Sequence, residues 1–182
     1  MKTQEVQFKS EELKKYMSEN YDIDKDGKIT PYDMAQITEL DIRYIDNNID
    51  LTGLEKCISL KKLLMRKTTN YDVLKNLSNL ETVQIEFLED LSELTKLKNI
   101  PNLKKLIFEL YSEKFDISQL PTQIEELSVQ AYHLNLTPLT NFKNLKKLSI
   151  SGSEEEIKGL DVINQISTLK ELKITNNSEM TN

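Results

Sequence analysis

The chain has 182 residues, a formal net charge of −6, 38% hydrophobic residues and 30% charged residues. This length allows one extended domain with a small additional element. Lysine and arginine do not gather into a patch that would bind a phosphate backbone, so nucleic acid is not an expected partner. No run approaches the ~20 apolar residues of a membrane-spanning helix, which argues against membrane insertion.

Cys57 is the only cysteine, so an internal disulfide is excluded. Its place among apolar residues favours a buried core thiol over a reactive one. The N-terminal segment MKTQEVQFKSEELKK contains no apolar run and is not expected to be a secretory signal. The compartment stays open: the cell surface or secretion fits a mature or trimmed chain, and the cytoplasm fits a native N-terminus.

The first predicted element is a helix over residues 10 to 20. Ser10 is a suitable N-cap, and the two glutamates that follow it suit the positive end of the helix dipole. Leu13, Tyr16 and Met17 share one side of this helix, which is therefore expected to pack against the rest of the chain.

An acidic segment, DIDKDGKITPYD, follows at residues 22 to 33. Alternate carboxylates at its first, third and fifth positions converge on a hard cation, and Gly27 permits the sharp turn at the sixth. The segment resembles the EF-hand calcium loop, and more closely the dockerin variant, in which the twelfth residue is commonly Asp. The resemblance implies a Ca2+ site with the ligands Asp22, Asp24, Asp26, Lys28 through its carbonyl, Thr30 and Asp33.

Two features qualify this calcium prediction. Asp33 is shorter than the usual Glu, so weaker closure on the ion and a lower affinity are expected. Dockerins carry two such segments and this sequence shows one, so docking to a cohesin is not expected. The alternative interpretation is an acidic turn that binds no ion.

Thr30 and Pro31 begin a second short helix, and residues 1–36 are predicted to form a helix–calcium loop–helix cap on the domain that follows.

From residue 37 the pattern Ile/Leu-x-x-Leu/Val-x-Ile recurs, in steps of 20 (Leu60 to Leu80) to 24 residues (Leu145 to Leu169). Such a period indicates stacked units that are each too small to bury their own apolar side. In a short strand, residues two apart face the same side, so the fourth and sixth motif positions point into a shared core. The triplets are Ile37-Leu40-Ile42, Leu60-Leu63-Met65, Leu80-Val83-Ile85, Leu103-Leu106-Phe108, Ile124-Leu127-Val129, Leu145-Leu148-Ile150 and Leu169-Leu172-Ile174.

Further apolar residues precede each triplet. They are Cys57, Leu77, Ile100, Phe142 and Ile166, and before them Leu54, Leu74, Leu97, Leu120, Leu139 and Ile163. Together with the triplets they resemble the leucine-rich repeat family over residues 37 to 177, as in small bacterial repeat proteins. The resemblance implies an α/β-type solenoid, a right-handed superhelix with a parallel β-sheet on its concave face and about seven repeats in residues 37–182. The family's asparagine at the ninth motif position occurs only as Asn177, so other groups must satisfy the turns.

Side chains expected on the concave face predict a protein-binding surface, because aromatic residues and arginine are enriched at interface centres. The candidate contacts are Tyr44, Leu64, Arg66, Phe87, Ile107, Glu109 and Tyr132. Two alternatives stand beside this prediction. Arg43 and Arg66 with Glu86 and Glu109 also fit a charge ladder between neighbouring strands. Residues at the eighth motif position, Leu110 among them, also fit core packing.

A non-catalytic protein–protein interaction module is the predicted function, and a calcium-responsive switch or buffer is the alternative. An enzyme is not expected, because His133 is the only histidine and no nucleophile elbow, metal cluster or phosphate loop accompanies it. After Ile174 the sequence is polar. The last strand is therefore expected to be covered by further repeats, by a capping region or by a second copy in an end-to-end homodimer.

Overall fold

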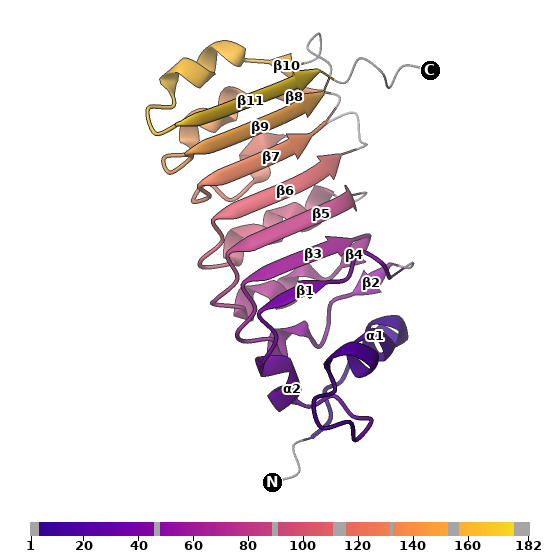
Figure 1. Ribbon diagram of the computed structural model, residues 1–182. Helices are drawn as coiled ribbons and strands as arrows, with labels where there is room; N and C mark the ends of the chain where they lie inside the picture. The colour runs from indigo at the N-terminus through magenta and orange to yellow at the C-terminus, as the bar shows by residue number, and fades with distance from the viewer. Residues whose placement is uncertain are drawn as a thin grey trace, which may run out of the picture.

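The computed structural model describes residues 4–45, 48–88, 91–110, 116–131, 133–152 and 157–176. Its main feature is a seven-stranded parallel sheet in the order β1-β3-β5-β6-β7-β9-β11, which follows the order of the chain (Figure 1). These strands are β1 (Glu39–Asp41), β3 (Lys62–Arg66), β5 (Thr82–Leu88), β6 (Lys105–Leu110), β7 (Glu126–Gln130), β9 (Lys147–Gly152) and β11 (Glu171–Asn176). Each strand lies within one of the predicted repeats.

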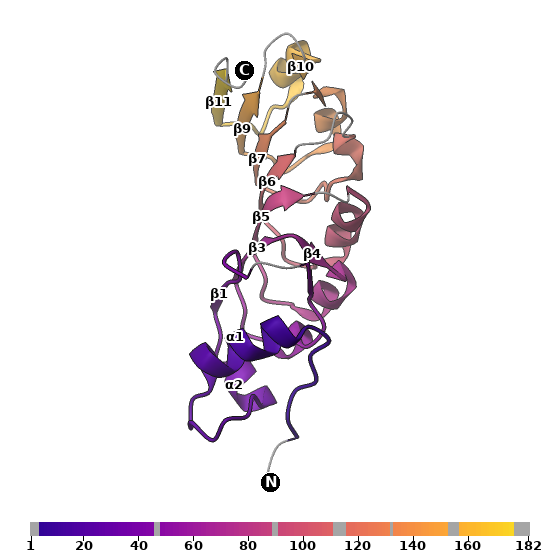
Figure 2. The same cartoon turned by 90° about the vertical axis from the view of Figure 1, so that its right-hand side faces the viewer.

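The connections return on the other side of the sheet as short 3-10 segments, so the molecule has two layers (Figure 2). These segments are η1 (Leu54–Lys56), η2 (Tyr71–Asn76), η3 (Leu91–Asn99), η4 (Ile117–Gln119), η5 (Thr137–Asn141) and η7 (Leu160–Gln165). Two small parallel pairs join neighbouring repeats, β2 (Ile49–Asp50) with β4 (Thr68–Thr69) and β8 (Leu134–Asn135) with β10 (Ile157–Lys158). The face of the sheet that no 3-10 segment covers is called the open face below.

The core lies between the sheet and the 3-10 segments. Strand register places equivalent motif residues side by side, as in Leu63 beside Val83 and Val83 beside Leu106. The first six triplets are buried, and so are the apolar residues that precede them in each repeat. In β11, by contrast, Leu172 is 47% exposed and Ile174 is 37% exposed. The predicted solenoid with a shared core is therefore confirmed, and within the described residues one side of its last strand is uncovered.

Side-chain amides form hydrogen bonds between successive turns on the side of the sheet where the strands begin. The side-chain amide of Asn79 donates to the carbonyl of Ile58 at 2.8 Å, and that of Asn102 donates to the carbonyl of Ser78 at 2.7 Å. Gln123 makes the equivalent bond in the next repeat. These amides precede the first motif residue, so they join the turns that come before successive strands.

Helix α1 (Glu11–Tyr21) and helix α2 (Pro31–Ala35) lie beside the first repeat (Figure 1). Ser10 accepts a hydrogen bond from the backbone of Leu13, as the sequence predicts for an N-cap. Leu13, Met17 and Met34 are fully enclosed in the common core. Among the described residues, no helix combines the length and the apolar character needed to cross a lipid bilayer.

Candidate functional site

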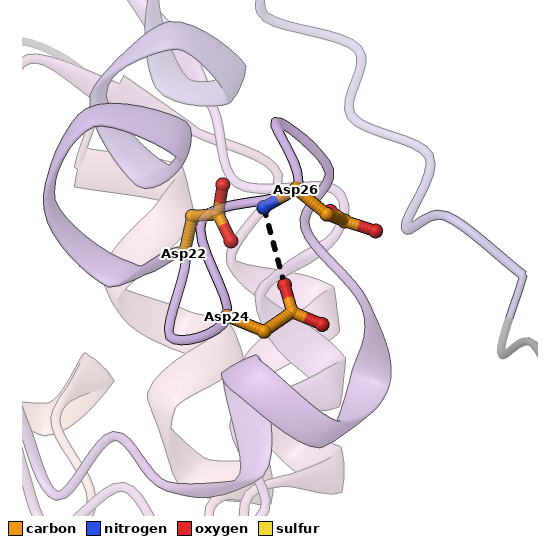
Figure 3. A group of neighbouring side chains, drawn as sticks. All are labelled: Asp22, Asp24 and Asp26. Atoms are coloured by element: carbon orange, nitrogen blue, oxygen red, sulfur yellow. Dashed lines mark hydrogen bonds between the residues drawn. The ribbon is translucent and has the colours of Figure 1, made fainter.

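The loop between α1 and α2 gathers the first three predicted metal ligands. Carboxylate oxygens of Asp22, Asp24 and Asp26 lie within 4.8 Å of one another, and Figure 3 shows the three side chains around one turn of the loop. Gly27 has a φ of +84°, a conformation that costs a residue with a side chain about 1–2 kcal/mol. The predicted glycine turn is thus present, and it lets the loop fold back over the carboxylates.

Backbone N–H groups hold the three carboxylates in place. Asp22 accepts from Gly27 at 2.8 Å, Asp24 from Asp26 at 3.3 Å, and Asp26 from Lys28 at 2.9 Å. The other oxygen of Asp22, Oδ1, is enclosed and has no hydrogen-bond donor among the described residues. An enclosed carboxylate oxygen without a donor is unfavourable unless a cation is near it. The oxygen atoms of these three carboxylates therefore fit Ca2+, a hard ion that prefers oxygen ligands.

Asp33 does not lie with this group. Its Oδ2 accepts from the backbone and the hydroxyl of Thr30, at 2.9 and 2.5 Å, and its Oδ1 accepts from the backbone of Ile23 at 3.2 Å. Burial raises the pKa of this carboxyl, but the bonds from Thr30 and Ile23 outweigh it and leave the pKa below its ordinary value. Asp33 and Thr30 thus form the capping box of α2, a role that the sequence pattern does not separate from metal binding.

The N-terminal segment fixes the other side of the loop. The backbone N–H of Val6 donates to the carbonyl of Ile29 at 2.8 Å, and both side chains are buried. The hydroxyl of Tyr16 donates to the carbonyl of Asp41 in β1 at 2.8 Å. The acidic loop is therefore tied to the first strand through α1.

An irregularity in β5 shapes the open face. Ile85 pairs with Phe108 and Leu88 pairs with Leu110, so β5 has one residue more than β6 between the same two rungs. This is a β-bulge, a feature that re-aims side chains. Phe87 lies within it and has a φ of +53°, which is strained for an aromatic residue.

The bulge brings Phe87 to Arg66. The guanidinium of Arg66 lies over the Phe87 ring, 4.2 Å from its centroid, a distance at which cation–π attraction is strong. The Nε of Arg66 is enclosed and has no acceptor among the described residues. A strained backbone and an unsatisfied donor are thus both found at the ends of β3 and β5 on the open face.

A second arginine nearby links β1 to β5. Arg43 binds both carboxylate oxygens of Asp41, at 2.9 and 2.7 Å, and reaches Glu86 at 2.7 Å. Its guanidinium holds the pKa of Asp41 below the usual value for Asp, and the two carboxylates raise the pKa of Arg43. Tyr44 follows, is 77% exposed, and has its ring 5.8 Å from the Arg43 guanidinium. We call Arg43, Tyr44, Arg66 and Phe87 the aromatic–arginine patch.

The other predicted contact residues differ in exposure. Leu64 is only 9% exposed, whereas Ile107 and Glu109 are half-buried. Tyr132 lies outside the described residues. Leu110, at the eighth motif position, is 1% exposed, because it alternates in phase with Leu106 and Phe108 and therefore points into the core. The alternative of core packing at the eighth motif position also holds for Ala131.

Beside the patch, small side chains leave a shallow hollow of about 660 Å³ on the open face of β6, β7, β9 and β11. Ser128 and Ser149 occupy its middle row, between Ile107 and Lys173. Its rim is a ladder of ion pairs from Lys105 through Glu126, Lys147 and Glu171. The open face thus has an aromatic and cationic half and a hollowed, hydroxyl-lined half.

The Arg43–Glu86 ion pair agrees with the charge ladder that the sequence offered as an alternative. Sequence reasoning missed the bulge and the link from Tyr16 to Asp41. Repeat spacing varies along the sequence, but this variation does not show whether an extra residue enters a strand or a turn. Cys57 is as predicted: it is fully enclosed, and burial raises the pKa of its thiol to about 12, so the thiol stays protonated.

Comparison with known proteins identifies the fold of this chain. No family model matches the sequence, and no curated protein matches it. An internalin (InlF) of Listeria monocytogenes superimposes with a TM-score of 0.58 at 20% identity, over 80% of this chain and 44% of that chain. Internalin C2 of the same species gives a TM-score of 0.49 at 17% identity, over 81% of this chain and 85% of that one. This chain spans less than half of the first internalin, and the likeness is one of fold: the sheet and its stacked turns are a leucine-rich repeat solenoid.

Proposed function

We propose that the chain is a non-catalytic protein–protein interaction module that binds its partner on the open face of the sheet. The observation that carries the proposal is the β5 bulge, which holds Phe87 in a strained conformation under Arg66. Strain of this kind persists where the surrounding structure maintains it, and it is commonest at functional sites. Solenoid folds present such sheet faces as extended binding surfaces.

The patch has the composition of an interface centre. Tyrosine, phenylalanine and arginine are enriched there. The aromatic rings offer large contact areas with few rotatable bonds, and arginine adds a planar group with five hydrogen-bond donors. Leu64, Ile107 and Glu109 extend this surface along the sheet, and the hollow beyond them accepts protruding side chains of a partner. Internalin-like solenoids offer the same architecture, although fold alone does not identify a partner.

A pull-down with a double variant tests this proposal. Tyr44→Ser removes an exposed ring, and Phe87→Asn removes the second ring while placing a residue that tolerates positive φ at that position. A matched control, Ile58→Ser with Tyr32→Ser, removes apolar groups that are 56% and 63% exposed outside the patch. The wild type and the control are expected to recover the same prey, and the patch variant is expected to lose it. Equal recovery by all three folded proteins contradicts the proposal.

We also propose a structural Ca2+ site at Asp22, Asp24 and Asp26, with Lys28 and Thr30 as further ligands. The enclosed, donor-less Oδ1 of Asp22 supports it. Asp33 would have to exchange its bonds to Thr30 and Ile23 for the ion, so we infer weak binding, in the range of about 10⁻⁴–10⁻³ M seen for extracellular modules. Such an affinity is consistent with a location at the cell surface or outside the cell.

Thermal unfolding in CaCl₂ and in chelator tests the metal proposal. At a tenfold excess of Ca2+ over its dissociation constant, linkage adds about 1.4 kcal/mol to the unfolding free energy, so the unfolding midpoint is expected to rise. Asp24→Asn retains the acceptor for the Asp26 N–H but removes a charge, and it should abolish the shift. Asp161→Asn, an exposed carboxylate in η7, should leave the shift intact. An unchanged wild-type midpoint contradicts a calcium site.

The alternative, a calcium-responsive switch, has one supporting observation, the bond from Tyr16 in α1 to Asp41 beside the patch. Partner affinity measured in CaCl₂ and in chelator separates the two functions. A structural ion is expected to raise the unfolding midpoint and leave the affinity unchanged. A change in affinity at temperatures where the chain stays folded supports the switch.

A further inference from the structure

The outer side of β11 combines apolar exposure with an unpaired strand edge. Leu172 and Ile174 are 47% and 37% exposed, whereas Leu148 and Ile150, their counterparts in β9, are 2% and 1% exposed. Leu160 of the preceding segment is 41% exposed. No strand in the described part of the chain pairs with this edge, and such an edge is a template for pairing with another chain.

The backbone direction of β11 decides which groups are available. The N–H of Glu171 donates to the carbonyl of Lys146 at 3.0 Å, so Glu171 turns its backbone groups toward β9. Backbone groups alternate sides along a strand, which also turns Lys173 toward β9. Leu172 and Ile174 therefore point their N–H and C=O groups away from the sheet, where a further strand can accept and donate hydrogen bonds.

We propose that β11 pairs with β11 of a second copy, antiparallel, about a two-fold axis at Leu172. Leu172 then exchanges both backbone hydrogen bonds with Leu172 of the partner subunit. Glu171 comes to lie directly opposite Lys173 of the partner subunit in a non-hydrogen-bonded pair, the kind in which side chains approach most closely. The two-fold axis generates a second copy of this ion pair. The contact is therefore self-complementary, as a two-fold interface requires.

The charged side chains favour a two-fold axis at Leu172 over an axis at either of the next two residues. An axis at Lys173 places two lysines directly opposite each other, which is destabilising. An axis at Ile174 places Lys173 opposite Thr175, with no ion pair. The axis at Leu172 also brings the two exposed leucines together, so it covers apolar surface and satisfies charge at once.

This pairing goes beyond the proposed function. A two-fold axis through an antiparallel strand pair runs perpendicular to the sheet, so the open faces of both copies look the same way. Each dimer then presents two aromatic–arginine patches on the same side. A bivalent partner can bind both patches at once and so gains avidity, although each patch makes the same contacts as in the monomer.

Sedimentation velocity over a range of protein concentrations tests the proposal. The wild type is expected to form a dimer. Glu171→Lys and Lys173→Glu each place like charges in opposition, and each should raise the dimer dissociation constant at least tenfold. The double variant Glu171→Lys with Lys173→Glu reverses both partners and should restore the dimer. Glu39→Lys, a charge reversal in the same row at the β1 end, should leave the dimer intact.

Circular dichroism establishes that each variant is folded before its assembly state is scored. A wild type that stays monomeric throughout overturns the proposal and leaves the β11 edge to a further segment of a longer chain. A folded double variant that fails to regain the dimer overturns the Leu172 register. Neither outcome affects the pull-down test of the patch, because Tyr44 follows β1 and Phe87 lies in β5, both away from β11.

Discussion

Leu106 and Leu172 occupy the same motif position in β6 and β11, yet their surroundings differ. Leu106 is fully enclosed and Leu172 is 47% exposed. Leu106→Ala leaves a cavity between sheet and 3-10 layer and is expected to lower the unfolding free energy by about 2–5 kcal/mol. Leu172→Ala should cost less than about 1 kcal/mol in the monomer, because little apolar surface is lost from the core. Urea unfolding at low protein concentration measures both, and equal losses contradict the assigned burial.

Asp41 is expected to make stability depend on pH in acid. Hydrogen bonds from Arg43 hold its pKa below the ordinary Asp value of about 3.9. A depressed pKa means that the stabilisation is present at neutral pH and is lost as the pH falls below about 4, through the folded pKa. The side chain is 33% exposed, so solvent screening limits the effect of Asp41→Asn at pH 7 to about 1 kcal/mol.

Urea unfolding of the wild type and Asp41→Asn at pH 7, 5 and 3 measures this effect. The difference between the two proteins should shrink as the pH falls. Asp161→Asn is the control and is expected to cause little change at any pH, because this carboxylate is exposed in η7. A difference that grows toward pH 3 shows that Asp41 does not act through its ionised form.

Single residues also show where prediction from the sequence ends. Leu54 and Phe142 were predicted as core residues from spacing alone, because the repeats carry apolar residues at the same positions before each triplet. Phe87 and Leu110 share the eighth motif position, and the sequence did not separate them. The extra residue in β5 places Phe87 at Arg66, whereas Leu110 points into the core by the regular alternation of β6. Asp33 fits both a metal ligand and a helix cap, and only its bonds to Thr30 identify the cap.

Among the elements, α1 couples the N-terminal cap to the sheet. The Tyr16 hydroxyl donates a hydrogen bond to the carbonyl of Asp41, the last residue of β1. Tyr16→Phe removes this donor and is expected to lower the unfolding free energy by about 0.5–1.5 kcal/mol. Tyr32→Phe removes the hydroxyl of a ring that is 63% exposed and should have almost no effect. Chemical denaturation compares the two variants, and equal effects contradict this coupling.

Elements with local signals were predicted well, and those that depend on neighbours were not. Helix α1 begins at its predicted cap because Ser10 and the residues after it determine it together. The strands were located by a motif that each repeat restates. The pairing of Val6 with Ile29 and the bulge in β5 arise from contacts between segments far apart or from the register of adjacent strands, and periodicity contains no information on either.

On the scale of the whole molecule, each repeat contacts mainly its neighbours, so local damage should stay local. The cap buries Met17 against the first repeat, where it is fully enclosed. Met17→Asp places an unpaired charge in that core, an unfavourable change that undocking the cap relieves. We expect faster amide exchange in β1 and β3 while protection in β9 is retained, because several intact repeats lie between them.

Hydrogen exchange followed by mass spectrometry resolves these strands. Lys15→Asp is the matched control, since it places the same residue on the solvent side of α1, where the lysine side chain is 76% exposed. It should leave exchange in β1 unchanged. Uniform loss of protection from β1 to β11 in Met17→Asp would mean that the solenoid unfolds as one cooperative unit. Loss limited to the first strands means that the cap stabilises its own end of the solenoid.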